Sequence, residues 1–330
     1  VGVCINLSNL YHTYEYSKET MRGKSELKQE GNAANQTSSG LDRDYITNWS
    51  YGIGETLTLL VPNVKGGASS DNLSQSEAAM EKANPMYSSI YSQFPQYFGD
   101  QPWTAGPVYV GAFVMFLFVL GCFIVKGPLK WALLGATIFS VLLSWGKNFM
   151  GLTDFFIDYV PMYNKFRAVS SILVIAEFTI PLLAIFALKE ILGRPEILKL
   201  KENRTGVIVS LVLTAGVSLV LAVAPSVFFS SFVTAQEMAA LQQGLPAEHL
   251  TPVVTNLTEM RKAIIASDAW RSFFIIAVGC FLLFLFLQKR LKASFTLVGI
   301  VLLCLVDMWC VNKRYLYDEQ FVPKSKRTEA

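Results

Sequence analysis

Long apolar stretches alternate with charged segments along this 330-residue chain and set the first expectations for its fold. A membrane-spanning helix needs roughly 20 apolar residues, because the hydrocarbon core of a bilayer is about 30 Å thick. Stretches of about that length begin near Pro107 and recur to the end of the chain. The pattern predicts six membrane spans, near residues 107–125, 131–146, 168–188, 205–232, 272–288 and 294–311.

The polar segments complete this picture. Residues 1–10 are typical of the last turns of an earlier transmembrane helix, so we expect the chain to be a fragment of a longer polypeptide. Residues 11–106 are polar and too long for a simple connection, and such loops usually carry function. Residues 312–330 are expected to begin a further extracytoplasmic segment. The expected fold is therefore an all-α, polytopic transmembrane helix bundle with one large extracytoplasmic loop.

The distribution of basic residues predicts the orientation of this bundle. Cytoplasmic loops carry an excess of Lys and Arg. The loops after the first, third and fifth predicted spans hold ten basic residues, whereas loops 147–167 and 233–271 hold three each. The first group is therefore expected in the cytoplasm, with residues 11–106 and the C-terminus outside it. The ten are Lys126, Lys130, Lys189, Arg194, Lys199, Lys201, Arg204, Lys289, Arg290 and Lys292.

Composition supports a membrane protein and narrows the function classes. Of all residues 52% are hydrophobic and 16% are charged, against about 25% charged in soluble domains. The net charge of +3 gives no support for nucleic-acid binding. The sequence contains no P-loop, no Rossmann glycine pattern and no G-x-S-x-G motif, so neither a soluble enzyme of those classes nor a primary pump is supported.

Metal binding has little basis in the sequence. The five cysteines lie inside apolar stretches and the two histidines are far apart, so neither residue type forms a metal motif. Asp42 and Asp44 have the spacing of a metal-binding carboxylate pair, but solvated loop charges are the default interpretation. The sequence therefore identifies no cofactor with certainty, and a divalent metal remains an option through these two residues.

The segment 147–167 carries the densest candidate chemistry. A helix near 153–160, capped by Thr153, is expected to lie in the outer interface, with Asp154 and Asp158 one turn apart on one face. Lys165 and Arg167 follow at the mouth of the next span. Cations there suit a lipid phosphate, which arginine can bind through two parallel hydrogen bonds. Anchoring of the helix in the headgroup layer is the alternative interpretation.

Two further acidic residues lie within the predicted spans. Glu177 falls near mid-membrane, where ionisable groups are costly and usually functional. It is expected to face another helix or a cavity, either as a working group or as a protonated, hydrogen-bonded one. Asp307 lies near the outer end of the last span, where it either pairs with Lys313 or Arg314 or lines an outer cavity.

Several long stretches resemble the YfhO-like family of bacterial membrane proteins, and together they cover most of the chain. They are GLDRDYITNWSYGIGETLTLLVPNVKGG (40–67), YFGDQPWTAGPVYVG (97–111), SWGKNFMGLTDFFIDYVPMYNKFRAVSSILVIAEFTIPLL (144–183) and LVDMWCVNKRYL (305–316).

The resemblance implies a fold and an activity like those of GT-C glycosyltransferases. In these enzymes an outward-facing cavity accepts a sugar on a polyprenyl-phosphate lipid and passes it to an acceptor outside the cytoplasm. For this chain that implies envelope glycan or lipid modification at a bacterial inner membrane, with membrane lipids and a lipid-linked sugar as ligands. The usual catalytic carboxylate lies in an earlier outer loop, before the expected start of this chain, so it is not carried over.

The residues can be placed in this scheme as candidates. Arg167, with Lys165, would bind the lipid phosphate, and Asp154, Asp158 or Asp307 would activate an acceptor hydroxyl. One alternative is a transporter or flippase of a lipid-linked substrate with Glu177 as coupling group. Another is a non-catalytic envelope-assembly protein whose outer loop binds a protein partner that the sequence does not identify.

Overall fold

A computed structural model describes residues 2–20, 37, 40–317 and 321 of the chain. Within this described part the secondary structure is helical, apart from an isolated antiparallel bridge between Asn72 and Pro95. The predicted all-α fold is therefore confirmed. The α-helices are α1 (Gly2–Ile5), α2 (Leu7–Lys18), α3 (Arg43–Thr47), α4 (Glu77–Met80), α5 (Ser88–Tyr91), α6 (Ala112–Ile124), α7 (Pro128–Ser144), α8 (Met150–Tyr159), α9 (Val174–Gly193), α10 (Lys201–Leu211), α11 (Val217–Val223), α12 (Ala235–Gly244), α13 (Ala247–Leu287) and α14 (Ala293–Tyr315).

The chain divides into two compact units, each described here by itself. The first contains Val1–Ile53, Asp100–Pro102 and Ile138–Val174, and so holds α3, α8 and the end of α7. The second contains Gly54–Gly99, Trp103–Thr137 and Ile175–Ala330, and so holds α4 to α6 and most of the helices from α9 onward.

Four helical segments in the described part are long and apolar enough to cross a membrane, which supports a membrane protein. They are Val169–Gly193, Lys201–Val223, Ala247–Leu287 and Ala293–Tyr315, and they overlap four of the six predicted spans.

The two remaining predicted spans have shorter helices. At 107–125 the chain forms α6, whose 13 residues reach only about 20 Å. At 131–146 the chain forms α7. This helix is long and apolar enough to cross a membrane only when it is counted together with the helical segment Gly146–Tyr159, from which a bend of 108° separates it.

The prediction of a loop at 233–271 was wrong. Residues 235–244 form α12, and α13 then runs for 41 residues without interruption, about 60 Å. The predicted span 272–288 is only the apolar second half of this helix. Charged residues in its first half interrupt the hydropathy signal but not the helix, because their side chains are paired.

Other predicted boundaries shift by smaller amounts. The predicted span 205–232 is helical only to Val223 and contains a π-helical turn at Val212–Gly216. Its end is set by Pro225, which opens a short 3-10 turn. At the start of the chain the helix α2 continues past residue 10 to Lys18. At the other end α14 continues past residue 311 to Tyr315, and most of the segment 312–330 lies outside the described residues.

In the second unit α6 lies inside the bundle, with most of its side chains buried. Two glycines on neighbouring helices permit its close approach. A Cβ atom at Gly279 of α13 would lie 2.2 Å from the ring of Phe113, and one at Gly206 of α10 would lie 2.6 Å from the Cβ of Phe123. Small residues at such contacts are typical of helix packing in membranes.

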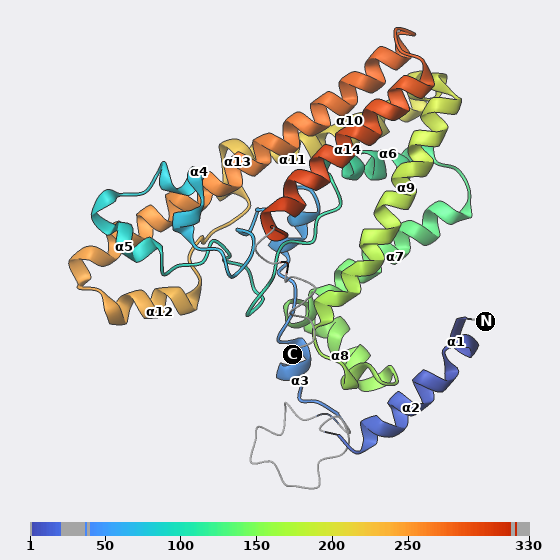
Figure 1. Cartoon of the computed structure of the whole chain (residues 1–330). Coiled ribbons are helices and arrows are strands. Elements are labelled where there is room, and N and C mark those ends of the chain that lie inside the picture. The colour runs from blue at the N-terminus through green and yellow to red at the C-terminus, as the bar shows by residue number, and fades with distance from the viewer. Residues whose placement is uncertain (1, 21–36, 38–39, 318–320, 322–330) are drawn as a thin grey trace. The chain divides into compact units, whose positions relative to one another are not determined.

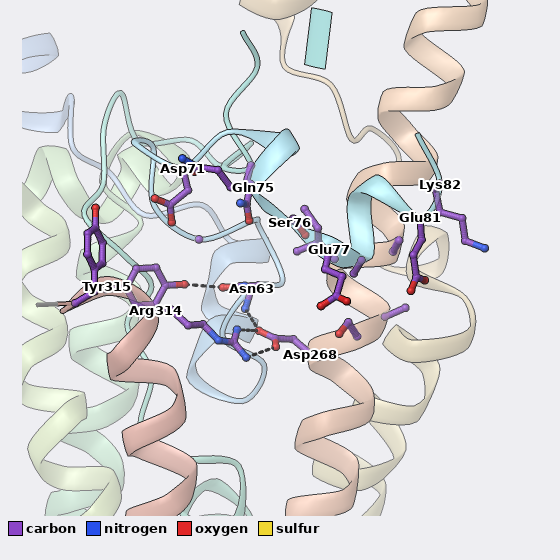
Figure 2. Close-up of a pocket in the computed structure, with 18 residues that line it drawn as sticks. Asn63, Asp71, Gln75, Ser76, Glu77, Glu81, Lys82, Asp268, Arg314 and Tyr315 are labelled. Carbon is purple, nitrogen blue, oxygen red and sulfur yellow. Dashed lines mark hydrogen bonds and ion pairs between the residues drawn. The ribbon is translucent and has the colours of Figure 1, made fainter. Parts of the chain in front are cut away.

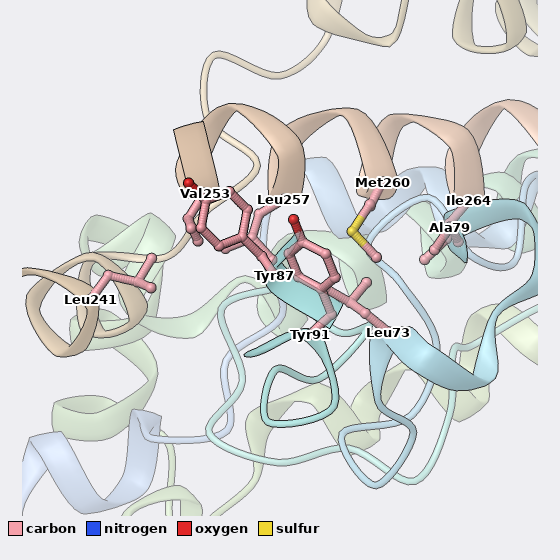
Figure 3. Close-up of a cluster of buried hydrophobic side chains, with 9 residues drawn as sticks. All are labelled: Leu73, Ala79, Tyr87, Tyr91, Leu241, Val253, Leu257, Met260 and Ile264. Atoms are coloured by element: carbon pink, nitrogen blue, oxygen red, sulfur yellow. The ribbon is translucent and has the colours of Figure 1, made fainter. Parts of the chain in front are cut away.

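The first half of α13 packs with residues 73–94 and α12 around an apolar cluster, and we call residues 73–94, α12 and Ala247–Ile264 the α13 lobe. Figure 3 shows its apolar core, in which Tyr87 and Tyr91 pack beside α13. The core consists of Leu73, Ala79, Tyr87, Tyr91, Leu241, Val253, Leu257, Met260 and Ile264.

A buried ion pair closes this lobe. Arg261 has no exposed surface, and its guanidinium donates to both carboxylate oxygens of Glu237 on α12, at 2.8 and 2.5 Å. It also donates to the backbone oxygens of Phe232 and Pro95, at 2.7 and 2.8 Å. Arg261 therefore ties together three segments that are far apart in sequence.

We expect Arg261→Met to destabilise the α13 lobe by about 3–5 kcal/mol, because Glu237 would remain largely buried without its partner. Amide hydrogen exchange in α12, measured on the protein in detergent, reports this loss as faster local opening. Lys262→Met is the matched control, since that side chain makes an exposed ion pair with Glu259, and it should cost less than about 1 kcal/mol. Equal effects of the two substitutions would contradict the assignment.

Candidate functional site

In the first unit Asp154 and Asp158 lie on one face of α8, as predicted, and both bind a residue that the sequence did not single out. Arg43, on α3, donates through Nη1 to Asp154 at 2.5 Å and through Nη2 to Asp158 at 2.7 Å. One guanidinium shared between two carboxylates fastens α3 to α8, above an apolar cluster of Leu41, Ile46 and Ile157.

The helix α8 begins earlier than predicted. It starts at Met150, so Thr153 lies inside its first turn and not at the capping position. The Thr153 hydroxyl is buried and donates to the backbone oxygen of Gly146 at 2.9 Å. Thr153 thereby ties α8 back to the turn at Gly146, just after α7.

Arg167 is held by aromatic side chains. Its Nη1 donates to the Tyr45 hydroxyl at 2.8 Å, and its guanidinium carbon lies 5.6 Å from the Tyr45 ring centre and 5.4 Å from that of Trp49. Such cation–π contacts orient a guanidinium without neutralising it. Arg167 is exposed and makes no ion pair with any residue in the described part of the chain. Within the described part of the chain it is therefore a fixed positive charge without an acidic partner.

The backbone around Arg167 is also unusual. Met162 and Ala168 have φ angles of 67° and 63°, in the left-handed region that residues with a side chain seldom adopt. Such conformations are costly and gather at functional sites. Lys165, between them, is partly buried, and this burial lowers its pKa below the ordinary lysine value. Its charge is thus less favoured than that of Arg167.

In the second unit Asp307 is buried and its predicted partners were wrong. It accepts hydrogen bonds from Arg271 of α13, from the Tyr109 hydroxyl at 2.9 Å and from the backbone nitrogen of Ala112 at 3.1 Å. Arg314 is two turns away along α14, roughly 10 Å, and pairs with Asp268 instead. Asp307 therefore secures α14 and the start of α6 to α13, and does not line the cavity described below.

Glu177 was expected to face another helix or a cavity, and the described residues do not provide a partner for it. It is exposed on α9 and makes no hydrogen bond or ion pair with any residue that the structure describes. The reason lies in the helix face: Ala176, Thr179 and Ile180 are buried, and Glu177 lies on the other side with exposed Phe178. The expected partner on another helix is therefore not found among the described residues.

Asp42 and Asp44 are both exposed, and Asp42 stands at the start of α3. In the described residues no group of three or more His, Cys, Asp or Glu side chains is arranged to hold a metal ion. The geometry thus gives the weak metal candidates no additional ligands.

The second unit contains a polar cavity that the sequence did not reveal. Its volume is about 850 Å³, and it is enclosed by the segment 63–96, by residues 263–268 of α13 and by the end of α14 (Figure 2). Arg314 donates to both oxygens of Asp268, at 2.7 and 2.8 Å, and the Tyr315 hydroxyl donates to Asn63 at 2.7 Å. This cavity is the second candidate site.

The missed residues were visible in the sequence only as ordinary charges and rings. Arg43, Tyr45 and Trp49 stand together in the stretch 40–67, and nothing in their spacing indicates that they meet residues more than 100 positions later. Asp268 and Arg314 flank apolar stretches, where single charges are common. Their pairing depends on the side-by-side packing of α13 and α14.

Comparison of the chain with protein-family models, curated proteins and solved structures finds no match.

We expect Arg43→Ala to loosen α3 by up to about 1 kcal/mol, because its ion pairs are partly exposed to water. Hydrogen exchange of the amides in 43–47 should accelerate a few-fold. Arg204→Ala, which removes an exposed arginine of α10 that has no ion pair in the described part, is the control and should leave those amides unchanged. Unaltered exchange in the Arg43 variant would show that apolar packing alone holds α3.

Proposed function

We propose that the chain is part of a GT-C-like membrane glycosyltransferase that uses a polyprenyl-phosphate-linked sugar at the extracytoplasmic face of a bacterial inner membrane. The single observation that carries the proposal is the Arg167 guanidinium, which is fixed on Tyr45 and Trp49 and has no carboxylate partner among the described residues. The resemblance to YfhO-like proteins supplies the reaction class, and the apolar helices supply the membrane setting.

The chemistry requires a cation of this kind. An acceptor hydroxyl attacks the anomeric carbon, its proton passes to a base on the water side, and the bond between sugar and phosphate oxygen breaks. The leaving phosphate gains negative charge in that step, and a guanidinium already in place stabilises the charge without reorganising. Arg167 can offer two N–H groups to a phosphate, as its planar fork permits. Asp154 and Asp158 are held by Arg43, so their contribution is to position α8.

The surroundings of Arg167 suit a lipid headgroup. Phe155, Tyr159 and Phe166 are each more than half exposed in the same unit. Aromatic side chains are enriched where a protein surface meets the membrane interface. A phosphate held at that level leaves its prenyl chain in lipid.

The alternatives receive less support. A transporter or flippase would use Glu177 inside the bundle, but Glu177 is exposed and unpartnered in the described part. A non-catalytic assembly protein would bind its partner through the outer region, and the α13 lobe offers a folded surface for that. No specific contact favours this second reading.

Binding of citronellyl phosphate, a short water-soluble isoprenyl phosphate, tests the phosphate site directly. Arg167→Ala should weaken binding on the order of tenfold or more, since a charge-assisted hydrogen bond is worth about 1.5–3 kcal/mol. Arg167→Lys keeps the charge but loses the fork, so it should fall between the wild type and the Ala variant. Arg204→Ala is the matched control and should bind normally. Equal binding by wild type and Arg167→Ala would remove Arg167 from the site, and binding without sugar transfer would favour the assembly protein.

We further propose six spans, with residues 11–106 and the C-terminus outside the cytoplasm, from the distribution of basic residues. Single cysteines in a cysteine-free background test this orientation. Met86→Cys, at an exposed position, should react with a membrane-impermeant thiol reagent in intact cells. Lys199→Cys, also exposed, should react only after permeabilisation. The reverse pattern would overturn the orientation and the placement of Arg167 at the outer face.

A further inference from the structure

The cavity of the second unit has the size and the fixed floor of a ligand site. Its volume of about 850 Å³ falls in the range of small-molecule sites, roughly 300–1,000 Å³. Asp268, whose side chain is 6% exposed, accepts two hydrogen bonds from Arg314 and one from the backbone nitrogen of Asn63 at 3.1 Å. With its oxygens so engaged, this pair forms a rigid and electrically neutral floor.

The other side chains that line the cavity are mostly carboxylates, which can accept hydrogen bonds from a ligand. Glu77 and Glu81 line the cavity and are exposed, and their carboxylates make no hydrogen bond or ion pair with described residues. Asp71 also lines it, accepts one hydrogen bond from Ser70 at 3.3 Å, and has a pKa raised above the ordinary aspartate value by burial. Lys82 is the one cation on this side, and in Figure 2 its ammonium points away from the Asp268–Arg314 pair.

Charge and donor balance then define the ligand. Four carboxylates line the cavity against two cations, which gives a formal charge of −2. A complementary ligand must therefore be rich in hydrogen-bond donors and must not be anionic. A bare metal ion is a poor match, because in the described residues no three potential ligands converge. Tyr315 and Tyr317 add aromatic surface to this polar wall.

We propose that this cavity binds a carbohydrate, with Glu77, Glu81 and Asp71 accepting hydrogen bonds from its hydroxyl groups, and that it prefers amino sugars to uronic acids. Vicinal hydroxyls supply the donors that the carboxylates need, and the tyrosine rings cover the apolar faces of sugar rings. An ammonium group gains from the negative charge, and a carboxylate on the ligand is repelled by it.

This inference goes beyond the proposed transferase and does not rest on Arg167. Oligosaccharide binding that persists in Arg167→Ala would separate the two sites. Failure of transfer would then leave the cavity assignment intact, and failure of oligosaccharide binding would leave the phosphate site intact.

The test is titration calorimetry of the whole chain in detergent with three matched trisaccharides: a glucosamine trimer, maltotriose and a galacturonic acid trimer. Affinity should fall in that order. The double variant Glu77→Gln/Glu81→Gln should weaken glucosamine-trimer binding on the order of tenfold or more, as expected for two lost charge-assisted bonds. These side chains make no described contact, so the variant should fold normally. Glu202→Gln, an exposed carboxylate of α10 outside the cavity, is the matched control and should bind like wild type.

Each contrary outcome is decisive. Tightest binding of the galacturonic acid trimer, or equal binding by wild type and the double variant, would overturn the assignment. Spermidine, a cation without hydroxyl groups, is included to separate charge attraction from sugar recognition. If spermidine bound as tightly as the glucosamine trimer while maltotriose did not bind, the cavity would be a cation site and the carbohydrate assignment would be wrong.

Discussion

Two oppositely directed ion pairs between α13 and α14 set the register on which much of the second unit depends. Asp268 of α13 binds Arg314 of α14, and Arg271 of α13 binds Asp307 of α14. Each helix contributes one cation and one anion. Because the helices are antiparallel, the earlier residue of α13 pairs with the later residue of α14, and the later residue of α13 pairs with the earlier one of α14. A slip of one residue would break both pairs and leave buried charges without partners, at several kcal/mol each. Apolar packing permits neighbouring registers more readily, so the charges select one.

The same arrangement connects the membrane helices to the polar parts of the unit. Asp307 also accepts a hydrogen bond from the first backbone nitrogen of α6. The helix α6 in turn packs against α13 at Gly279 (Figure 1). Asp268 also accepts from Asn63, which binds Tyr315. The pair that fixes the helix register is thus the floor of the cavity. A ligand in that cavity would contact a surface whose shape is determined by the bundle. Substitutions at Asp268 or Arg314 would therefore change both the stability of the fold and the affinity for a ligand, and a binding measurement could not separate the two effects. Glu77 and Glu81 avoid that difficulty.

The apolar stretches predicted the helical membrane class because hydropathy depends on local composition alone. Four of the predicted spans coincide with long apolar helices for that reason. The length of α13 could not be predicted in this way. Arg261, Asp268 and Arg271 look like loop charges in the sequence, and only their partners Glu237, Arg314 and Asp307 make a continuous helix compatible with burial. The orientation argument changes accordingly, because Arg261 and Arg271 are bound within the protein and do not act as free loop cations.

The first unit shows the same limit in its candidate site. The sequence places two carboxylates, Asp154 and Asp158, and three cations within the segment 147–167, but it does not indicate which groups bind one another. Arg43 enters from a distant part of the chain and binds both Asp154 and Asp158, whereas no described residue forms an ion pair with Arg167. An arginine paired with two carboxylates would have little positive potential left for a phosphate. Two aromatic rings, and no carboxylate of a described residue, hold the Arg167 guanidinium in place. The partner of Asp154 and Asp158 lies more than 100 residues earlier in the chain, and no spacing rule within residues 147–167 contains that contact.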